Sequence, residues 1–380
     1  MIYLDYAATT PMSEDSLDIF NQVSRSFFGN PNSLHDAGTR SSQLLESCRT
    51  ELAELLDCGH KGIYFTSGGS ESNILALSSL IDAHKDKGNH LITTVSEHSS
   101  IYNFFTQMEK VGFDVTYLPL DEYGQIQLED LKNAIRKTTI LVSIHHGNGE
   151  IGTLQPIESI GNILHQHEIL FHCDAVQTFG KVPINLNKID SLSISSHKLY
   201  GPKGVGAVYI NPQVKWNAQM PNTTHEGGFR PGTVNVPGIT AFVTSAKAVC
   251  DDRIKEHKRI DGLRAALMDK LKQLPITIQM EGHPTDYLPH ILGFRIDGIE
   301  GQYVMLECNR YGIAISTGSA CQVGNHKLSR TMKALGRSDA EAKQFIRLSF
   351  GKHTTIEDID KTAEAFKKIT DRFFLIEGDE

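Results

Sequence analysis

Short apolar runs rich in β-branched and aromatic residues alternate with longer amphipathic stretches over most of this 380-residue chain. Stretches with helical periodicity, such as 74–85 and 157–167, separate the runs. Strand followed by helix, repeated, predicts an α/β fold with a largely parallel sheet. Five runs have the length and composition of buried strands, at 62–66, 90–93, 140–144, 169–172 and 206–210.

The pattern changes after about residue 250. A long charged helical stretch over 251–274 is followed by strand-like segments at 291–296 and 314–316. We therefore expect a large domain and a smaller α+β domain. The predicted boundaries are 12–250 for the large domain, and 1–11 with 251–380 for the small one.

Composition narrows the class of protein. With 37 basic and 45 acidic residues the net charge is −8, so no basic surface for nucleic acid is expected. No apolar stretch has the length of a membrane span, and no basic residue precedes Arg25, so we expect no secretory signal. Six cysteines at long spacings argue against a zinc finger or a disulfide framework and favour a reducing, cytoplasmic location.

A glycine- and serine-rich segment, TSGGSESN at 66–73, follows one predicted strand and begins a helix. Its backbone N–H groups, its hydroxyls and the positive helix end make a cradle in which a phosphate would fit. The segment lacks the glycine spacing of a P-loop or a dinucleotide fingerprint. Taken alone, a simple turn explains it equally well.

Two charged residues follow later strands. Asp174 lies at the carboxyl edge of the predicted sheet, where it could hold a protonated ring nitrogen or cap a helix. Lys198 lies between an alternating strand and a Gly-Pro turn, where a closed pocket would make it a Schiff-base nucleophile, although most loop lysines are merely solvated. The phosphate cradle, the aspartate and the lysine together are the contacts that pyridoxal phosphate requires.

A cluster of histidines suggests a metal site as an alternative. His165 and His167 are two apart on a helical pattern, so their rings diverge, and we expect no metal centre. The other members of that cluster are His145, His146, His172 and Asp174.

Cys321 lies in a stretch of small and polar residues, 316–325, between a predicted strand and a helix. Structural cysteines usually have apolar neighbours, so this thiol is predicted to be exposed and reactive. The alternative is a loop thiol without a role, because exposure alone does not produce a thiolate.

The chain resembles the cysteine desulfurases, which are fold-type-I pyridoxal-phosphate enzymes. The matching motifs run in order along nearly the whole chain. They are YLDYAATTP at 3–11, GNPNSLH at 29–35, TSGGSESN at 66–73, EH at 97–98, DAVQ at 174–177, SSHKLYGPKG at 195–204, RPGT at 230–233, GSAC at 318–321 and RLSFG at 347–351.

This resemblance implies a role for each matching residue. Lys198 would carry the cofactor as a Schiff base, Asp174 would hold its ring nitrogen, Gln177 would contact its ring oxygen, and His98 would stack on the ring and transfer protons. The phosphate contacts implied are Gly69, Ser70, Ser195, His197 and, from the neighbouring subunit, Thr233. Arg347 would bind the substrate carboxylate, for which a bidentate guanidinium is suited.

One position departs from the family pattern. Two adjacent asparagines usually precede Glu-Ile-Gly, whereas this chain has Asn148 followed by Gly149. Either Asn148 shifts to provide the missing contact with the cofactor, or that contact is absent.

The implied activity converts L-cysteine to L-alanine and leaves the sulfur on Cys321 as a persulfide. An acceptor protein would then take the sulfur for iron–sulfur cluster or thio-cofactor assembly. The resemblance also implies a seven-stranded sheet and a homodimer, while the charge and the hydropathy predict no direct binding of nucleic acid or membrane. A selenocysteine lyase or an aminotransferase on the same scaffold, a non-catalytic scaffold protein and a metal hydrolase are the alternatives.

Overall fold

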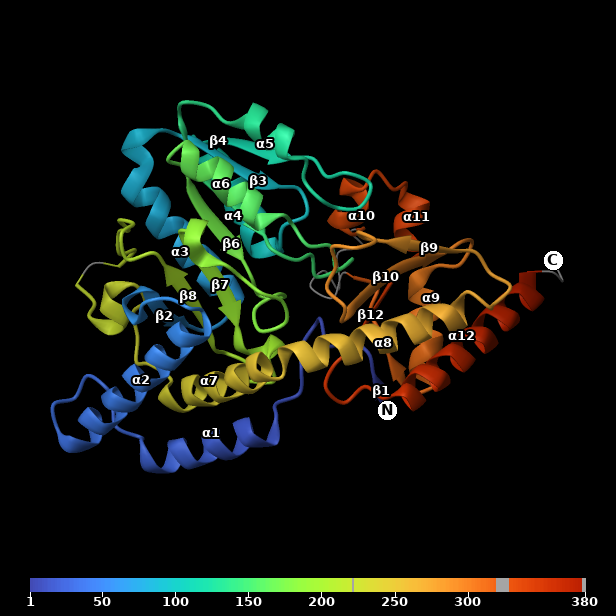
Figure 1. Ribbon diagram of the computed structural model, residues 1–380, viewed down its shortest axis with the longest axis horizontal. Helices are drawn as coiled ribbons and strands as arrows, with labels where there is room; N and C mark the ends of the chain where they lie inside the picture. Colours follow the sequence, from blue (N-terminus) through green and yellow to red (C-terminus); the bar gives the residue numbers. More distant parts are fainter. Residues whose placement is uncertain (221, 319–327, 378–380) are drawn as a thin grey trace.

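The computed structural model describes residues 1–220, 222–318 and 328–377. Figure 1 shows two lobes, one built around a large twisted sheet and the other around a smaller sheet with long helices. The large lobe contains the strands β2 (Ile63–Thr66), β3 (His90–Thr94), β4 (Asp114–Leu118), β5 (Thr139–His145), β6 (Leu170–Asp174), β7 (Ser191–Ser195) and β8 (Gly206–Ile210). Its helices are α1 (Glu14–Ser26), α2 (Asp36–Leu55), α3 (Gly69–His84), α4 (Ser99–Lys110), α5 (Leu128–Ala134), α6 (Ile157–Gln166) and α7 (Val236–Asp251).

The seven strands of the large lobe form one sheet in the order β2-β8-β7-β6-β5-β3-β4. β8 runs opposite to the other six strands, so it is antiparallel to both of its neighbours, β2 and β7. The predicted α/β class with a mostly parallel seven-stranded sheet is therefore confirmed.

Helices cover both faces of this sheet, as buried parallel strands require. Consecutive strand residues point to opposite faces: Leu91 packs in a cluster with α3 and α4, and Ile92 packs in a cluster with α2, α5, α6 and α7. Because both faces are buried, β5 and β6 carry consecutive apolar residues, at 140–142 and 170–171, instead of a strict alternation, and these runs are recognisable in the sequence.

The small lobe has an antiparallel sheet in the order β12-β10-β9 and a two-stranded pair, β1 with β11. Its strands are β1 (Ile2–Tyr3), β9 (Ile278–Glu281), β10 (Ile291–Ile296), β11 (Ile313–Ala314) and β12 (Phe345–Ser349). Its helices are α8 (Arg253–Leu271), α9 (Gly301–Arg310), α10 (Arg330–Ala334), α11 (Asp339–Lys343) and α12 (Ile356–Glu377).

The N-terminal segment joins the core of the small lobe. Leu4 is fully buried in a cluster that otherwise consists of residues between Ile260 and Ile369. In Figure 1, α7 and α8 follow each other from one lobe to the other, with Asp252 between them. The boundary predicted near residue 250 falls at this junction and stays a prediction.

Most predicted elements lie within two residues of the observed ones. Strand β4 was not predicted because it is a half-exposed edge strand with a weak apolar pattern. The segment predicted as a strand over 314–316 is shorter than expected, since β11 ends at Ala314 and Ser316 makes only an isolated bridge to Arg347. Within the described residues, no helix combines the length and apolarity needed to cross a membrane.

Candidate active site

A cavity of about 730 Å³ opens where the carboxyl ends of β5, β6 and β7 meet the start of α3. This edge of a parallel sheet is where α/β folds usually bind ligands. Ten of the residues predicted from the sequence line it together: Gly69, Ser70, His98, Asn148, Asp174, Gln177, Ser195, His197, Lys198 and Arg347.

Lys198 ends a short 3₁₀ turn, Ser196–Lys198, directly after β7. Its Nζ donates to the carbonyl oxygens of Ala7 and Ala8 at 2.6 and 2.8 Å. The next turn is tight, because Tyr200 adopts a left-handed backbone with φ of 62°. The N-terminal segment thus holds the lysine amine at the cavity wall.

Asp174 is the last residue of β6 and is paired in register with His145 of β5. Its Oδ1 accepts from the backbone N–H of Val176 at 2.9 Å, and its Oδ2 accepts from Asn73 Nδ2 at 2.8 Å. The carboxylate therefore caps the local turn and also faces the cavity, so the two interpretations of Asp174 are compatible.

The phosphate cradle is built from glycine backbone and a buried hydroxyl. Gly68 has φ of 149° and immediately precedes α3. A Cβ on Gly69 would lie 2.6 Å from Val176 Cγ2, so a side chain there would fill the cradle. The Ser195 hydroxyl is buried and has no hydrogen-bond partner among the described residues.

Pyridoxal phosphate fits the groups present. Gln177 Oε1, like the Ser195 hydroxyl, is buried without a partner among the described residues, while Gln177 Nε2 donates to the Ala7 carbonyl at 3.0 Å. Burial and the neighbouring positive charge of Lys198 lower the pKa of His197 to about 4, so this imidazole is neutral beside the cradle. The cavity thus presents a carboxylate, an amine and uncharged polar groups to one ligand.

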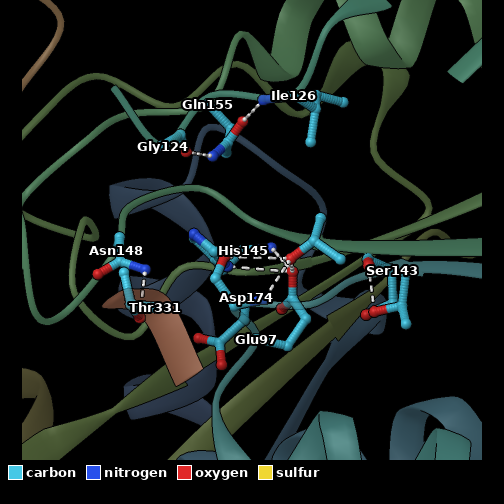
Figure 2. A network of polar contacts seen from close by, with 12 residues as sticks. Glu97, Gly124, Ile126, Ser143, His145, Asn148, Gln155, Asp174 and Thr331 are labelled. Carbon is cyan, nitrogen blue, oxygen red and sulfur yellow. Dashed lines mark hydrogen bonds and ion pairs between the residues drawn. The ribbon is translucent and has the colours of Figure 1, made fainter. Parts of the chain in front are cut away.

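Asn148 lines the cavity and is held by contacts within the protein. Its Oδ1 accepts from the backbone N–H groups of Glu150 and Ile151 at 2.8 and 3.1 Å. Its Nδ2 donates to Thr331 Oγ1 at 3.4 Å (Figure 2). Both polar ends of this side chain are therefore engaged within the protein.

The space beside Gly149 belongs instead to Gln177. A Cβ on Gly149 would lie 3.1 Å from Gln177 Nε2. A side chain at this position would require the Gln177 amide to move by a few tenths of an ångström.

Arg347 comes from the small lobe, on β12. Its Nη2 donates to Asp5 Oδ1 at 2.6 Å and its Nη1 donates to the Gly149 carbonyl at 2.9 Å. Its Nε is buried without a partner among the described residues. Arg347 thus brings a fixed positive charge from the small lobe to the cavity lined by the large one.

Glu97 pairs with His145, a contact that no local sequence pattern indicates. Glu97 Oε1 accepts from the backbone N–H of His145 and from its Nδ1, both at 3.0 Å, and from Thr94 Oγ1 at 2.9 Å. Figure 2 shows this pair beside Asp174. Burial alone would lower the pKa of His145, but the Glu97 carboxylate raises it above its usual value. The described residues contain no group of side chains suited to a metal ion.

Two further site residues were predicted, Thr233 and Cys321. Thr233 is exposed and does not line the cavity. Cys321 lies within 319–327, outside the described residues. The described residues on either side of that segment, Gly318 and Ser329, both line the cavity.

Comparison with known proteins agrees with this geometry. The family model described as aminotransferase class-V matches residues 2–362. A putative cysteine desulfurase NifS from Bacillus subtilis is 50% identical over 370 residues, which covers 96% of this chain and 94% of that protein. The chain belongs to the cysteine desulfurases of the class-V aminotransferase family.

Other members of the family give the same picture. Cysteine desulfurase IscS from Dictyoglomus turgidum is 36% identical and covers 99% of this chain and 96% of its own length. A solved NifS-like protein superposes with a TM-score of 0.91 at 31% identity, over 97% of this chain and 99% of that one. SspA, solved in complex with cysteine, superposes with a TM-score of 0.80 at 31% identity and covers 93% of this chain and all of its own. Class-V aminotransferases depend on pyridoxal phosphate, which is the cofactor predicted from the residues of the cavity.

Proposed function

We propose that the protein is a pyridoxal-phosphate cysteine desulfurase, with Lys198 as the residue that binds the cofactor covalently. The observation that carries the proposal is that the Lys198 amine, the Asp174 carboxylate and the cradle all line one cavity. The cradle is formed by the backbone at Gly69 and the hydroxyl of Ser195. The naming of the relatives as cysteine desulfurases supports the choice of L-cysteine as substrate.

When bound, pyridoxal phosphate supplies an electron sink that makes the Cα–H of an attached amino acid acidic. Asp174 would keep the ring nitrogen protonated, because a carboxylate beside a pyridine favours its charged form. Lys198 would take the Cα proton and return it, and Arg347 would fix the substrate carboxylate. Since Arg347 already contacts Asp5, substrate binding requires the guanidinium to share or exchange that contact.

Cys321 would attack the sulfur of the substrate as a thiolate. The new S–S bond would form as the Cβ–S bond of the substrate breaks, and the electron pair of the broken bond would stay on Cβ, which is protonated to give the methyl group of alanine. An acceptor thiol would then attack the persulfide and carry the sulfur to iron–sulfur or thio-cofactor assembly. The position of both flanks of 319–327 at the cavity supports this role for Cys321.

The exposure of Thr233 supports a homodimer in which each subunit contributes this hydroxyl to the phosphate site of its partner. A dimer-specific test is to mix two inactive proteins, Thr233→Ala and Lys198→Ala. In a mixed dimer, one of the two sites has both Lys198 and the partner's Thr233 intact. Random exchange of subunits makes half of all dimers mixed, so up to about one quarter of the wild-type activity should return. The free thiols of the described cysteines support a reducing, cytoplasmic location.

The test of the activity uses Cys321→Ala and Lys198→Ala. Cys321→Ala is expected to bind pyridoxal phosphate with the absorbance of wild type but to release neither alanine nor sulfide from L-cysteine. Lys198→Ala is expected to lose the borohydride-reducible link to the cofactor. Cys250→Ala, a change at a half-buried thiol outside the cavity, is the matched control and should keep full activity.

The products separate the alternatives on the same scaffold. Alanine with sulfide identifies a desulfurase, a keto acid identifies an aminotransferase, and strong preference for selenocysteine identifies a lyase of that amino acid. Full desulfuration by Cys321→Ala would refute the assignment of Cys321, and no cofactor absorbance in wild type would favour a scaffold protein.

A further inference from the structure

A buried side chain with no role assigned above connects two parts of the site. Asn73 lies in the first turns of α3 and is only 1% exposed. One amide hydrogen of its Nδ2 is directed to Asp174 Oδ2 at 2.8 Å, and the other to Ser100 Oγ at 3.1 Å. One planar amide therefore contacts two separate elements, the end of β6 and the start of α4.

The orientation of this amide follows from its partners. A carboxylate only accepts, so Nδ2 must face Asp174 and Oδ1 must face His172. His172 Nε2 lies 3.1 Å from Asn73 Oδ1, so Nε2 carries the proton, and His172 Nδ1 accepts from Ser191 Oγ at 3.1 Å. Burial lowers the pKa of His172 to about 3, which keeps this imidazole neutral and in the single tautomer that the chain of hydrogen bonds requires.

A second arm leads from Asn73 to His98. Ser100 Oγ accepts from Asn73, so its own hydrogen is free to point to His98 Nδ1 at 2.8 Å. The backbone N–H of Ser100 is also directed to His98 Nδ1, at 3.2 Å. With Nδ1 accepting from both, the neutral ring of His98 carries its proton on Nε2.

Asp174 and His98 are the two groups proposed to contact the cofactor ring at its nitrogen and on its face. We propose that Asn73 is a positioning residue that links the carboxylate of Asp174 to the imidazole of His98, so that one buried amide fixes both against the cofactor. The proposal rests on the function proposed above and goes beyond it, because Asn73 itself need not touch the cofactor.

Other titratable groups face the two ends of this network. His145 of β5, paired with Glu97, lies next to Asp174, and His197, from the turn after β7, lies near His98. His145 is hydrogen-bonded to Glu97 and His197 to Thr9, and within the described part of the chain neither histidine is hydrogen-bonded to Asn73 or Ser100. The Asn73 network can therefore be perturbed without removing either group.

The first measurement is the affinity of the cofactor-free protein for pyridoxal phosphate, by absorbance titration. Asn73→Ala removes a donor from a buried carboxylate and is expected to weaken binding about 10- to 100-fold. Ser100→Ala leaves the Asp174 arm intact and is expected to stay within about twofold of wild type. His172→Gln, which can keep a donor toward Asn73 Oδ1, should bind better than His172→Leu, and this pair tests the network if Asn73→Ala does not fold.

The second measurement is kcat for L-cysteine at one fixed pH, with each variant saturated with cofactor. Ser100→Ala removes a donor that orients the imidazole of His98 and is expected to shift kcat downward by about 3- to 10-fold. In the Asn73→Ala background the hydroxyl is no longer held, and the same serine change should then give a clearly smaller shift in kcat.

Equal shifts in the two backgrounds, or unchanged cofactor affinity of Asn73→Ala, would overturn the proposal. If wild type binds the cofactor and desulfurates cysteine while the Asn73 effects are absent, only this inference fails. If wild type neither binds nor turns over, the proposed function is wrong and the inference is wrong with it.

Discussion

A buried ion pair holds the loop that leads to Thr233. Arg49 of α2 and Glu226 of the 3₁₀ turn His225–Gly228 are joined by two hydrogen bonds of 2.8 and 2.9 Å, and the Glu226 side chain is 1% exposed. Glu226 Oε2 also accepts from the backbone N–H of Phe65 at 2.6 Å. The left-handed backbone of Glu226, with φ of 46°, depends on these contacts.

Arg49→Met removes the guanidinium but keeps most of the side-chain volume. Glu226 Oε1 then has no donor, and Oε2 keeps only the Phe65 N–H. Removing one partner of a buried ion pair costs about 3–5 kcal/mol, because the remaining charge is left uncompensated. The variant Arg49→Met/Glu226→Gln removes the stranded charge and keeps an acceptor for Phe65, so it should recover about half of that loss.

The assay is urea unfolding of the cofactor-free protein at fixed concentration, in which the midpoint shift gives the change in free energy of unfolding. Arg136→Met is the matched control, because its ion pair with Asp114 is more than half exposed and contributes less than about 1 kcal/mol. If Arg49→Met lost no more stability than Arg136→Met, the reasoning about this buried pair would be refuted.

Three further predictions concern the cavity and its surroundings. Gly69→Ala places a Cβ 2.6 Å from Val176 Cγ2 and should weaken the binding of pyridoxal phosphate about tenfold, as measured by absorbance titration. Unchanged binding would show that the phosphate does not lie against Gly69. Arg347→Lys loses the planar fork and should raise KM for L-cysteine about 10- to 100-fold with a smaller change in kcat; an unchanged KM in steady-state assays would exclude it from substrate binding. Burial lowers the pKa of His146 to about 4, from about 6.5 in the unfolded chain. Between pH 6.5 and pH 4 the unfolded chain therefore binds a proton on His146 that the folded protein does not bind, so the free energy of unfolding falls as the pH drops through this range. His146→Asn should therefore reduce the loss of unfolding free energy between pH 6.5 and 4 by about 3 kcal/mol, and an unchanged slope in urea unfolding across this range would contradict the buried neutral imidazole.

The sequence predicted the central sheet well because its inner strands are buried on both faces. β5 and β6 contain consecutive apolar residues, at 140–142 and 170–171, and this pattern does not depend on distant contacts. The edge strand β4 is half exposed, so its pattern is close to that of a loop. Strand β11 has only two residues and forms by pairing with β1, which lies about 310 residues earlier in the chain.

The sequence predicted the individual residues of the candidate site but not the hydrogen bonds between them. Asp174 and Lys198 follow strands that are adjacent in the sheet, so local position was enough to place them at one edge. The contacts of Arg347 with Asp5 and of Asn73 with Asp174 join residues 342 and 101 positions apart, and no local pattern encodes them. The contact of Asn148 with the Thr331 hydroxyl joins residues 183 positions apart, so the sequence alone could not place it.

The most direct test of the account is the position of the covalent link to the cofactor. The protein loaded with pyridoxal phosphate is reduced with borohydride, digested, and analysed by tandem mass spectrometry. The account predicts the reduced pyridoxyl group on Lys198, whose amine lies at the wall of the cavity. A group found on Lys203, which lines the same cavity, or on no lysine at all would contradict it.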